Sequence, residues 1–168
     1  MDKYYYLISQ LPFLKFSEET YMDQKAFLRE AEKWLSDKDL GKLKEADTDN
    51  LETEGRTYLL KKYKNFELNL RKEIATYRES RMKNKEYRPK GILTRSLLEG
   101  NPLEVERKLF LYRWQQIEEL SEGFVFNLEA VIAYFLKLQI LKKVLSFDKE
   151  RGTRRFNSLT EVTDEKLR

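Results

Sequence analysis

Apolar residues recur along most of this chain every three or four positions, which is the spacing of one face of an α-helix. In residues 4–16 the signal is mixed. Tyr4, Leu7 and Leu11 fit a helical face that Pro12 would end, whereas three consecutive tyrosines favour a strand by propensity. We favour the helix for this first segment.

The next segment has a clearer helical pattern. Ser17 is a suitable N-cap, and the acidic residues that follow it suit the positive end of a helix dipole. We therefore predict a helix from Ser17 to about Ser36, and a shorter one over residues 37–45. The apolar stripe of the first of these two helices is Tyr21, Phe27, Leu28, Ala31, Trp34 and Leu35.

A long helix is predicted over residues 49–83, followed by a loop at residues 84–91, where Pro89 and Gly91 interrupt any regular element. A helix of that length would span roughly 50 Å, which exceeds the diameter of about 32 Å of a compact domain of this size. We therefore expect part of the helix to protrude, or the protein to be elongated. The seam of this helix is Leu59, Tyr63, Phe66, Leu70, Ile74 and Tyr77.

The strongest local signal opens a helical hairpin. Asn101 is an N-cap, Pro102 takes the first helical position and Glu104 the third, so a helix should run to about Glu122. Asn127 caps a second helix over residues 128–150, which is apolar on almost all sides and should therefore lie at the centre of the fold. The short link makes the two helices antiparallel. Expected contacts join Leu103, Phe110, Trp114 and Ile117 to Phe135, Leu138 and Leu141.

These elements predict an all-α fold: one domain over residues 1–168, an elongated antiparallel helical bundle with one long helix. Its parts are N-terminal helices in residues 1–48, the long helix at 49–83 and the hairpin at 101–150. The most apolar stretch, residues 131–145, is interrupted by three lysines, and a membrane span needs roughly 20 apolar residues in a row. Residues 2–8 lack the pattern of a signal peptide, so we expect a cytosolic protein.

The amino-acid composition excludes several classes of catalytic and metal site. The chain has no histidine and no cysteine, which excludes thiol nucleophiles, histidine bases and Cys/His zinc sites. The six glycines are scattered singly and form no phosphate-binding loop. We expect no enzymatic activity, no cofactor, no metal and no small-molecule substrate.

The charge is distributed unevenly. Residues 1–55 carry a net −5, residues 56–100 a net +8 and residues 101–168 a net +1. The basic residues peak where the long helix ends, and such a zone attracts an acidic protein face, lipid head groups or nucleic acid, unless it is only a solvated helix end. Nucleic acid is the less favoured partner, because no reading module is recognisable. The candidate residues are Arg78, Arg81, Lys83, Lys85, Arg88 and Lys90.

The three tyrosines at residues 4–6 cannot all face one core from a helix. At least one should lie at a surface or a contact, and we take Tyr4 and Tyr5 as candidate partner-binding residues.

Residues 101–152 resemble the helical repeat of the C subunit of V/A-type ATPases, called d in the eukaryotic pump. The resemblance rests on the opening Asn101-Pro102-Leu103-Glu104 and on the segments 133–135 and 138–141 of the following helix. Gln139 stands where that subunit commonly has an acidic residue. The whole chain is similar to a small bacterial family of unknown function that is encoded among V/A-type ATPase genes, whose start is matched by Tyr5-Tyr6-Leu7 and Leu11-Pro12.

The resemblance implies a socket-like protein that joins the central shaft of the ATPase to its membrane rotor. The C subunit sits on the membrane rotor ring and receives the foot of the central shaft, so a protein in its place needs a rigid helical body and two contact surfaces. The implied partners are other ATPase subunits. The implied location is cytoplasmic, at the inner membrane only through the complex. The residues alone also fit a free-standing helical adaptor or a nucleic-acid-binding module that uses the basic zone.

Overall fold

The computed structural model describes residues 2–20, 22–52, 54–88, 91, 93–147, 153, 154 and 157. Regular structure in these residues is helical, and none of them belongs to a strand, so the predicted all-α class is confirmed. None of the helices in this described part has the length and apolarity that crossing a membrane would require.

The N-terminal part contains α1 (Asp2–Gln10), α2 (Gln24–Trp34) and α3 (Asp37–Lys44). The first segment is therefore a helix and not a strand, as predicted, because its apolar positions repeat with helical spacing and Leu7 is fully buried. The short third helix lies within one residue of its predicted bounds. Its N-cap is Ser36, whose side chain accepts a hydrogen bond from the backbone of Asp39.

The predicted start of the second helix at Ser17 is wrong. An N-cap residue has an extended backbone, whereas Ser17 has a φ of 66° and lies in a turn. The cap is Asp23, whose carboxylate oxygen accepts a hydrogen bond of 2.6 Å from the backbone N–H of Ala26. Both residues are acceptable caps by type, and the packing of the chain selects the later one.

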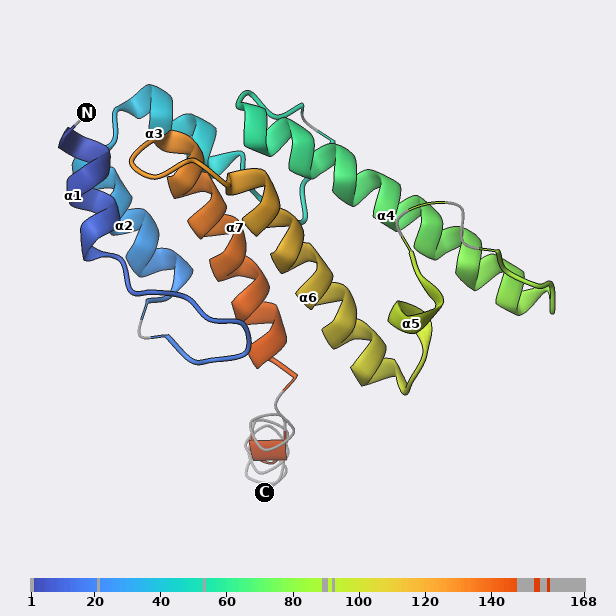
Figure 1. Cartoon of the computed structure of the whole chain (residues 1–168). Coiled ribbons are helices and arrows are strands. Elements are labelled where there is room, and N and C mark those ends of the chain that lie inside the picture. The colour runs from blue at the N-terminus through green and yellow to red at the C-terminus, as the bar shows by residue number, and fades with distance from the viewer. Residues whose placement is uncertain are drawn as a thin grey trace, which may run out of the picture.

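The long helix α4 (Tyr58–Met82) begins nine residues after the predicted start. Residues 47–52 instead form polar turns, in which the side chains of Asp47 and Asn50 accept hydrogen bonds from backbone N–H groups two residues further on. Such local bonds compete with helix formation. The 25 residues of α4 span about 37 Å, and the C-terminal end of α4 extends past α6, as Figure 1 shows.

The helical hairpin consists of α6 (Pro102–Ser121) and α7 (Leu128–Leu145), which are antiparallel neighbours as predicted (Figure 1). Both halves of the expected capping box of Asn101 and Glu104 are present. The end of α7 at Leu145 corrects the predicted end at 150. A short helix that sequence analysis missed, α5 (Arg95–Leu98), precedes the hairpin.

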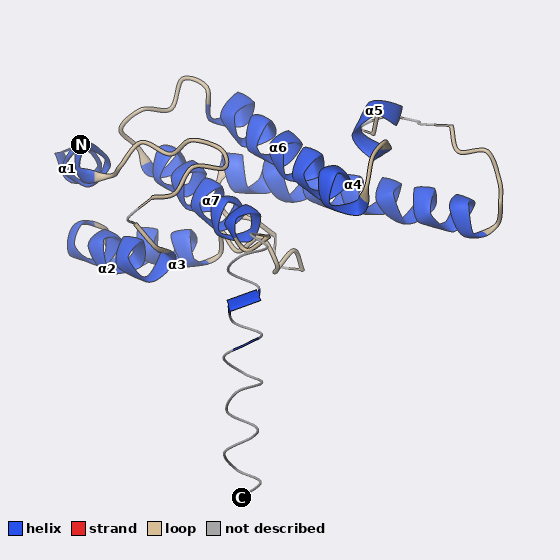
Figure 2. Cartoon of the chain, turned by 90° about the horizontal axis from the view of Figure 1, so that it is seen from below, coloured by secondary structure: helices blue, strands red, loops and turns tan. Residues whose placement is uncertain are grey.

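Helix α7 lies at the centre, as its all-round apolarity predicts. It packs against α1, α2, α3, α4 and α6, and Figure 2 shows it surrounded by them. The predicted hairpin contacts fit this core, in which Trp114 and Ile117 are buried with Phe135, Leu138 and Leu141 and Phe110 packs against them. Leu103 is the exception, because 45% of it is exposed at the start of α6.

A smaller cluster lies away from α7. It consists of Leu70 of α4, Leu109 of α6, and Leu93, which precedes α5. The predicted α4 seam residues Phe66 and Ile74 pack against it. This cluster holds the segment that contains α5 against the C-terminal half of α4.

Candidate functional site

The basic residues predicted as a contact zone occupy the last turns of α4 and the loop that follows. We call Arg78, Arg81, Lys83, Lys85 and Arg88 the basic tip; all five are exposed. Lys90, the sixth predicted residue, lies outside the described residues. The tip is therefore a solvent-facing set of cations at one end of the protein.

The ion pairs of the basic tip are made with nearby residues of α4, of the following loop and of α6. Lys83 pairs with Glu79 within the same helix, Arg88 approaches Glu86 at 3.7 Å, and Arg78 approaches Glu106 of α6 at 3.7 Å. Among the described residues, the tip makes no ion pair with the acidic stretch of residues 37–54. Internal pairing with that stretch therefore does not explain why basic residues gather here.

Tyr87 lies between the cations of the basic tip but does not present a free ring. It packs edge-on against Tyr77 of α4, with ring centroids 5.2 Å apart, and is half-buried. Burial raises the pKa of its hydroxyl. A ring held in this way is poorly placed to stack on a nucleic-acid base.

The N-terminal tyrosines divide between structural and surface positions. Tyr4 is half-buried, and its hydroxyl donates a 2.9 Å hydrogen bond to Asp39, which also accepts from Lys3 at 2.7 Å. Tyr5 and Tyr6 are 51% and 50% exposed. Tyr4 therefore links α1 to α3, while its two neighbours face outward.

Tyr5 and Tyr6 belong to a larger exposed group that sequence analysis did not identify. We call the exposed Tyr5, Tyr6 and Phe126, together with the half-buried Trp34, the aromatic surface. The ring of Tyr5 lies 4.9 Å from that of Phe126 in the α6–α7 turn, and Tyr6 stacks on Trp34 of α2 at 5.4 Å. Phe126 is 44% exposed. Three separate segments thus contribute to one apolar surface.

The two surfaces are far apart. Figures 1 and 2 place α1 at one end of the molecule and the C-terminal end of α4, which carries the basic tip, at the other. The helices between them share the core around α7.

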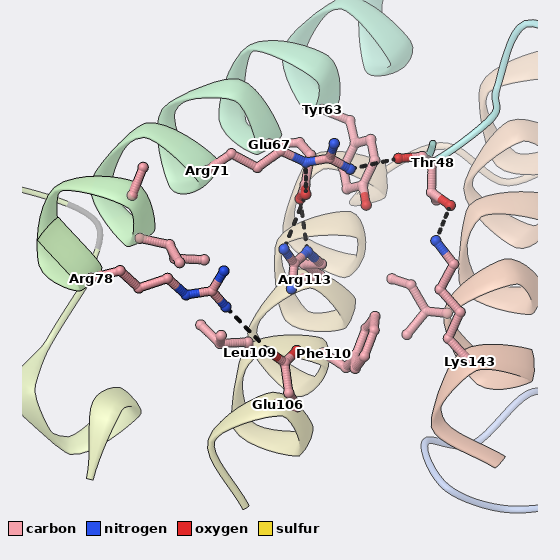
Figure 3. A pocket seen from close by; sticks show the side chains of 13 residues that line it. Thr48, Tyr63, Glu67, Arg71, Arg78, Glu106, Leu109, Phe110, Arg113 and Lys143 are labelled. Carbon is pink, nitrogen blue, oxygen red and sulfur yellow. Dashed lines mark hydrogen bonds and ion pairs between the residues drawn. The ribbon is translucent and has the colours of Figure 1, made fainter. Parts of the chain in front are cut away.

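Between the two surfaces, a cleft of about 320 Å³ opens among α4, α6 and α7 (Figure 3). Glu67 of α4 lies at its wall and is almost completely buried. Arg113 of α6 donates two hydrogen bonds to the Glu67 carboxylate, of 2.8 and 3.0 Å, and Arg71 donates a third of 2.9 Å. Arg71 also donates to the backbone oxygen of Thr48 at 3.0 Å.

Only one of the side-chain contacts in this cleft could be predicted from the sequence. Glu67 and Arg71 are four residues apart on one helix, a spacing at which side chains meet. Arg113 lies 46 residues from Glu67, and nothing local connects the two.

Comparison with protein families gives a match over part of the chain. Residues 93–165 are similar to a family described as "Protein of unknown function (DUF2764)". No curated protein and no solved structure matches the chain. The matched segment contains α5, α6 and α7, and so includes the central helix and the hairpin.

Proposed function

We propose that the protein is a non-catalytic structural and coupling component of a V/A-type ATPase, a socket like the C subunit between the central shaft and the membrane rotor. The proposal begins from the resemblance of residues 101–152 to that subunit. The family match over residues 93–165 includes this whole segment, although the family's description states no function.

The observation that carries the proposal is the separation of two unlike surfaces on one helical body. The aromatic surface suits an apolar partner, because exposed aromatic groups are typical of the centres of protein interfaces. The basic tip suits an acidic partner. A protein that joins two components needs two such surfaces at different places, and Figure 1 shows α1 and the C-terminal end of α4, which carry them, at opposite ends of the molecule.

The body between the surfaces has the properties of a rigid connector. The central helix α7 has buried residues on all sides. N-cap side chains accept hydrogen bonds from backbone N–H groups in the first turns of α2, α3, α4, α6 and α7. A dense core transmits displacement instead of absorbing it. In this proposal the protein is cytoplasmic and reaches the inner membrane only through the complex.

The basic tip provides the test of the partner contact. Changing Arg81, Lys85 and Arg88 to Glu should leave the melting temperature nearly unchanged, because these side chains are exposed and Arg88 has only a loose ion pair. Binding of the purified variant to the ATPase lacking this protein should weaken, and the loss should grow as salt is lowered, because screening decreases.

The matched control changes Lys25, Arg29 and Lys142 to Glu. These residues are also exposed, and the substitution alters the net charge equally. The control variant should bind normally. The partner role of the tip is refuted if the control and tip variants weaken binding equally, or if the tip variant loses its fold while its folded fraction binds normally.

The exposure of the basic tip also favours a second candidate, a free-standing adaptor or nucleic-acid-binding module that uses residues 78–90. A nucleic-acid complex would show a steep salt dependence, since each phosphate contact releases counterions. A gel-shift titration at low salt with both duplex and single strands tests it. Absence of a shifted band there would remove the nucleic-acid version.

A further inference from the structure

The cleft among α4, α6 and α7 shares only Arg78 with the basic tip and no residue with the aromatic surface. One side of it is polar and contains Glu67, Arg71 and Arg113, and Figure 3 shows the two guanidinium groups converging on the carboxylate. The rest of the lining includes the apolar side chains of Ile74, Leu109, Phe110 and Ile140. A volume of about 320 Å³ is at the small end of the range for ligand pockets.

Glu67 positions the two arginines. It accepts three charge-assisted hydrogen bonds from Arg113 and Arg71, all between 2.8 and 3.0 Å. A guanidinium group has five N–H donors. Arg113 uses two of its donors on Glu67, and Arg71 uses one on Glu67 and one on the backbone of Thr48. Each arginine thus keeps three donors in a fixed orientation.

The charge of the cleft is positive. Four cations line it, namely Arg71, Arg78, Arg113 and Lys143, against two carboxylates, Glu67 and Glu106. Arg78 reaches Glu106 only at 3.7 Å, so its guanidinium is loosely held near the opening. An anion that enters would meet donors on more than one wall.

The hydroxyl of Tyr63 is a further donor that faces the cleft. Tyr63 lines the cleft and is only 1% exposed, yet its hydroxyl has no hydrogen-bond partner among the described residues. Figure 3 shows the hydroxyl directed into the cleft. Because the hydroxyl makes no hydrogen bond within the described part of the protein and opens onto the cleft, it is free to donate to a ligand atom or a water that enters there. Burial raises the pKa of Tyr63, which keeps the phenol protonated as a donor.

We propose that this cleft binds a small organic anion, a carboxylate or a phosphate monoester with an apolar body. The anionic group accepts hydrogen bonds from Tyr63 and from the free N–H groups of Arg71 and Arg113, and the apolar body packs on Leu109 and Phe110. The ligand is bound and not converted. The inference does not rest on the proposed ATPase role, because Tyr63, Arg71 and Arg113 lie outside both contact surfaces; only Arg78 belongs to the cleft and to the basic tip.

The test is titration of the full chain with phenyl phosphate and with benzoate, followed by NMR chemical shifts, with phenol as the neutral probe. We expect saturable binding of at least one anion, with shifts at cleft residues, and much weaker binding of phenol. The tighter of the two anions identifies the class of ligand. Absence of saturable binding of either anion at millimolar concentrations would overturn the proposal.

Two variants locate the binding. Tyr63→Phe removes only the hydroxyl and should weaken binding about tenfold, because a hydrogen bond to a charged group is lost. Its melting temperature should not fall, since the hydroxyl has no protein partner. Arg78→Gln should also weaken binding, whereas Arg81→Gln removes the same charge from the same helix outside the cleft and should not. Equal effects of the two arginine variants, or unchanged binding by Tyr63→Phe, would refute the proposal.

Discussion

Replacing Gln139 by glutamate probes the contact between the central helix and the linker that follows α3. Gln139 is 5% exposed, and both ends of its amide are used. The side-chain oxygen accepts a 3.0 Å hydrogen bond from the backbone N–H of Thr48, and the side-chain nitrogen donates a 2.6 Å bond to the backbone oxygen of Ala46. The resemblance to the C subunit places an acidic residue at this position, but here the amide matches one acceptor and one donor.

The size of the effect follows from these two bonds. A glutamate keeps the bond from Thr48 but points a carboxylate oxygen at the carbonyl oxygen of Ala46, in a site with almost no solvent. The loss of the donor and the burial of a charge should together cost about 3 kcal/mol at pH 7.5. Protonation restores a donor toward Ala46, so the new carboxyl has a raised pKa in the folded protein.

The sign of the pH dependence follows from that raised pKa. The folded state binds a proton more tightly than the unfolded state, so the penalty is full above the folded pKa and decreases as pH falls through it. We expect the difference from wild type in the free energy of unfolding to fall below about 1 kcal/mol at pH 4. Urea unfolding of both proteins at pH 7.5 and pH 4 measures it.

The matched control is Gln139→Met, which leaves both Thr48 and Ala46 unpaired and has no proton to gain. It should be destabilised by about 2–4 kcal/mol at both pH values. A glutamate variant whose destabilisation is the same at pH 7.5 and pH 4, or one as stable as wild type at pH 7.5, would refute the described role of the amide.

Two further predictions concern the link between α1 and α3 and the core. The hydrogen bond from Lys3 and those from Ser36 and Tyr4 hold the pKa of Asp39 at about 2, below its ordinary value of 3.8. The lowered pKa of Asp39 stabilises the folded protein by about 2 kcal/mol at neutral pH, and this contribution should be lost as pH falls from 4 to 2. Urea unfolding should therefore show the stability of wild type falling toward that of Asp39→Asn over this range. A difference between the two proteins that stays constant with pH would contradict the prediction. Leu136→Ala should lower the free energy of unfolding by about 2–5 kcal/mol in the same assay, because Leu136 is fully buried on α7. Leu103→Ala, at a residue that is 45% exposed, should lower it by less than about 1 kcal/mol, and similar losses for the two variants would contradict the central position of α7.

The elements that sequence analysis predicts well are those with local causes. The start of α6 depends on Asn101 and Glu104, which lie three residues apart and bond to each other's backbone. The central place of α7 follows from apolar residues on every face. In contrast, Ser17 and Asp23 are equally good caps by residue type, and only packing distinguishes them.

The surfaces show the same division. The basic tip is a run in the sequence, and its exposure could be predicted from charge alone. The aromatic surface joins Tyr5 to Phe126, and the cleft joins Glu67 to Arg113, across the fold. Sequence spacing contains no information on such pairs, because they depend on how α1, α4 and α6 are arranged around α7. Of the cleft, only the Glu67–Arg71 pair on α4 was open to prediction.

The proposed role in a V/A-type ATPase is tested most directly by the composition of the complex in its native membrane. The measurement is purification of the solubilised, intact ATPase from native membranes through another subunit, followed by quantification of this protein by mass spectrometry. The proposal predicts that it co-purifies in a fixed ratio to the central-stalk subunits. Its absence from an intact complex in which the other stalk subunits are present would contradict the proposal.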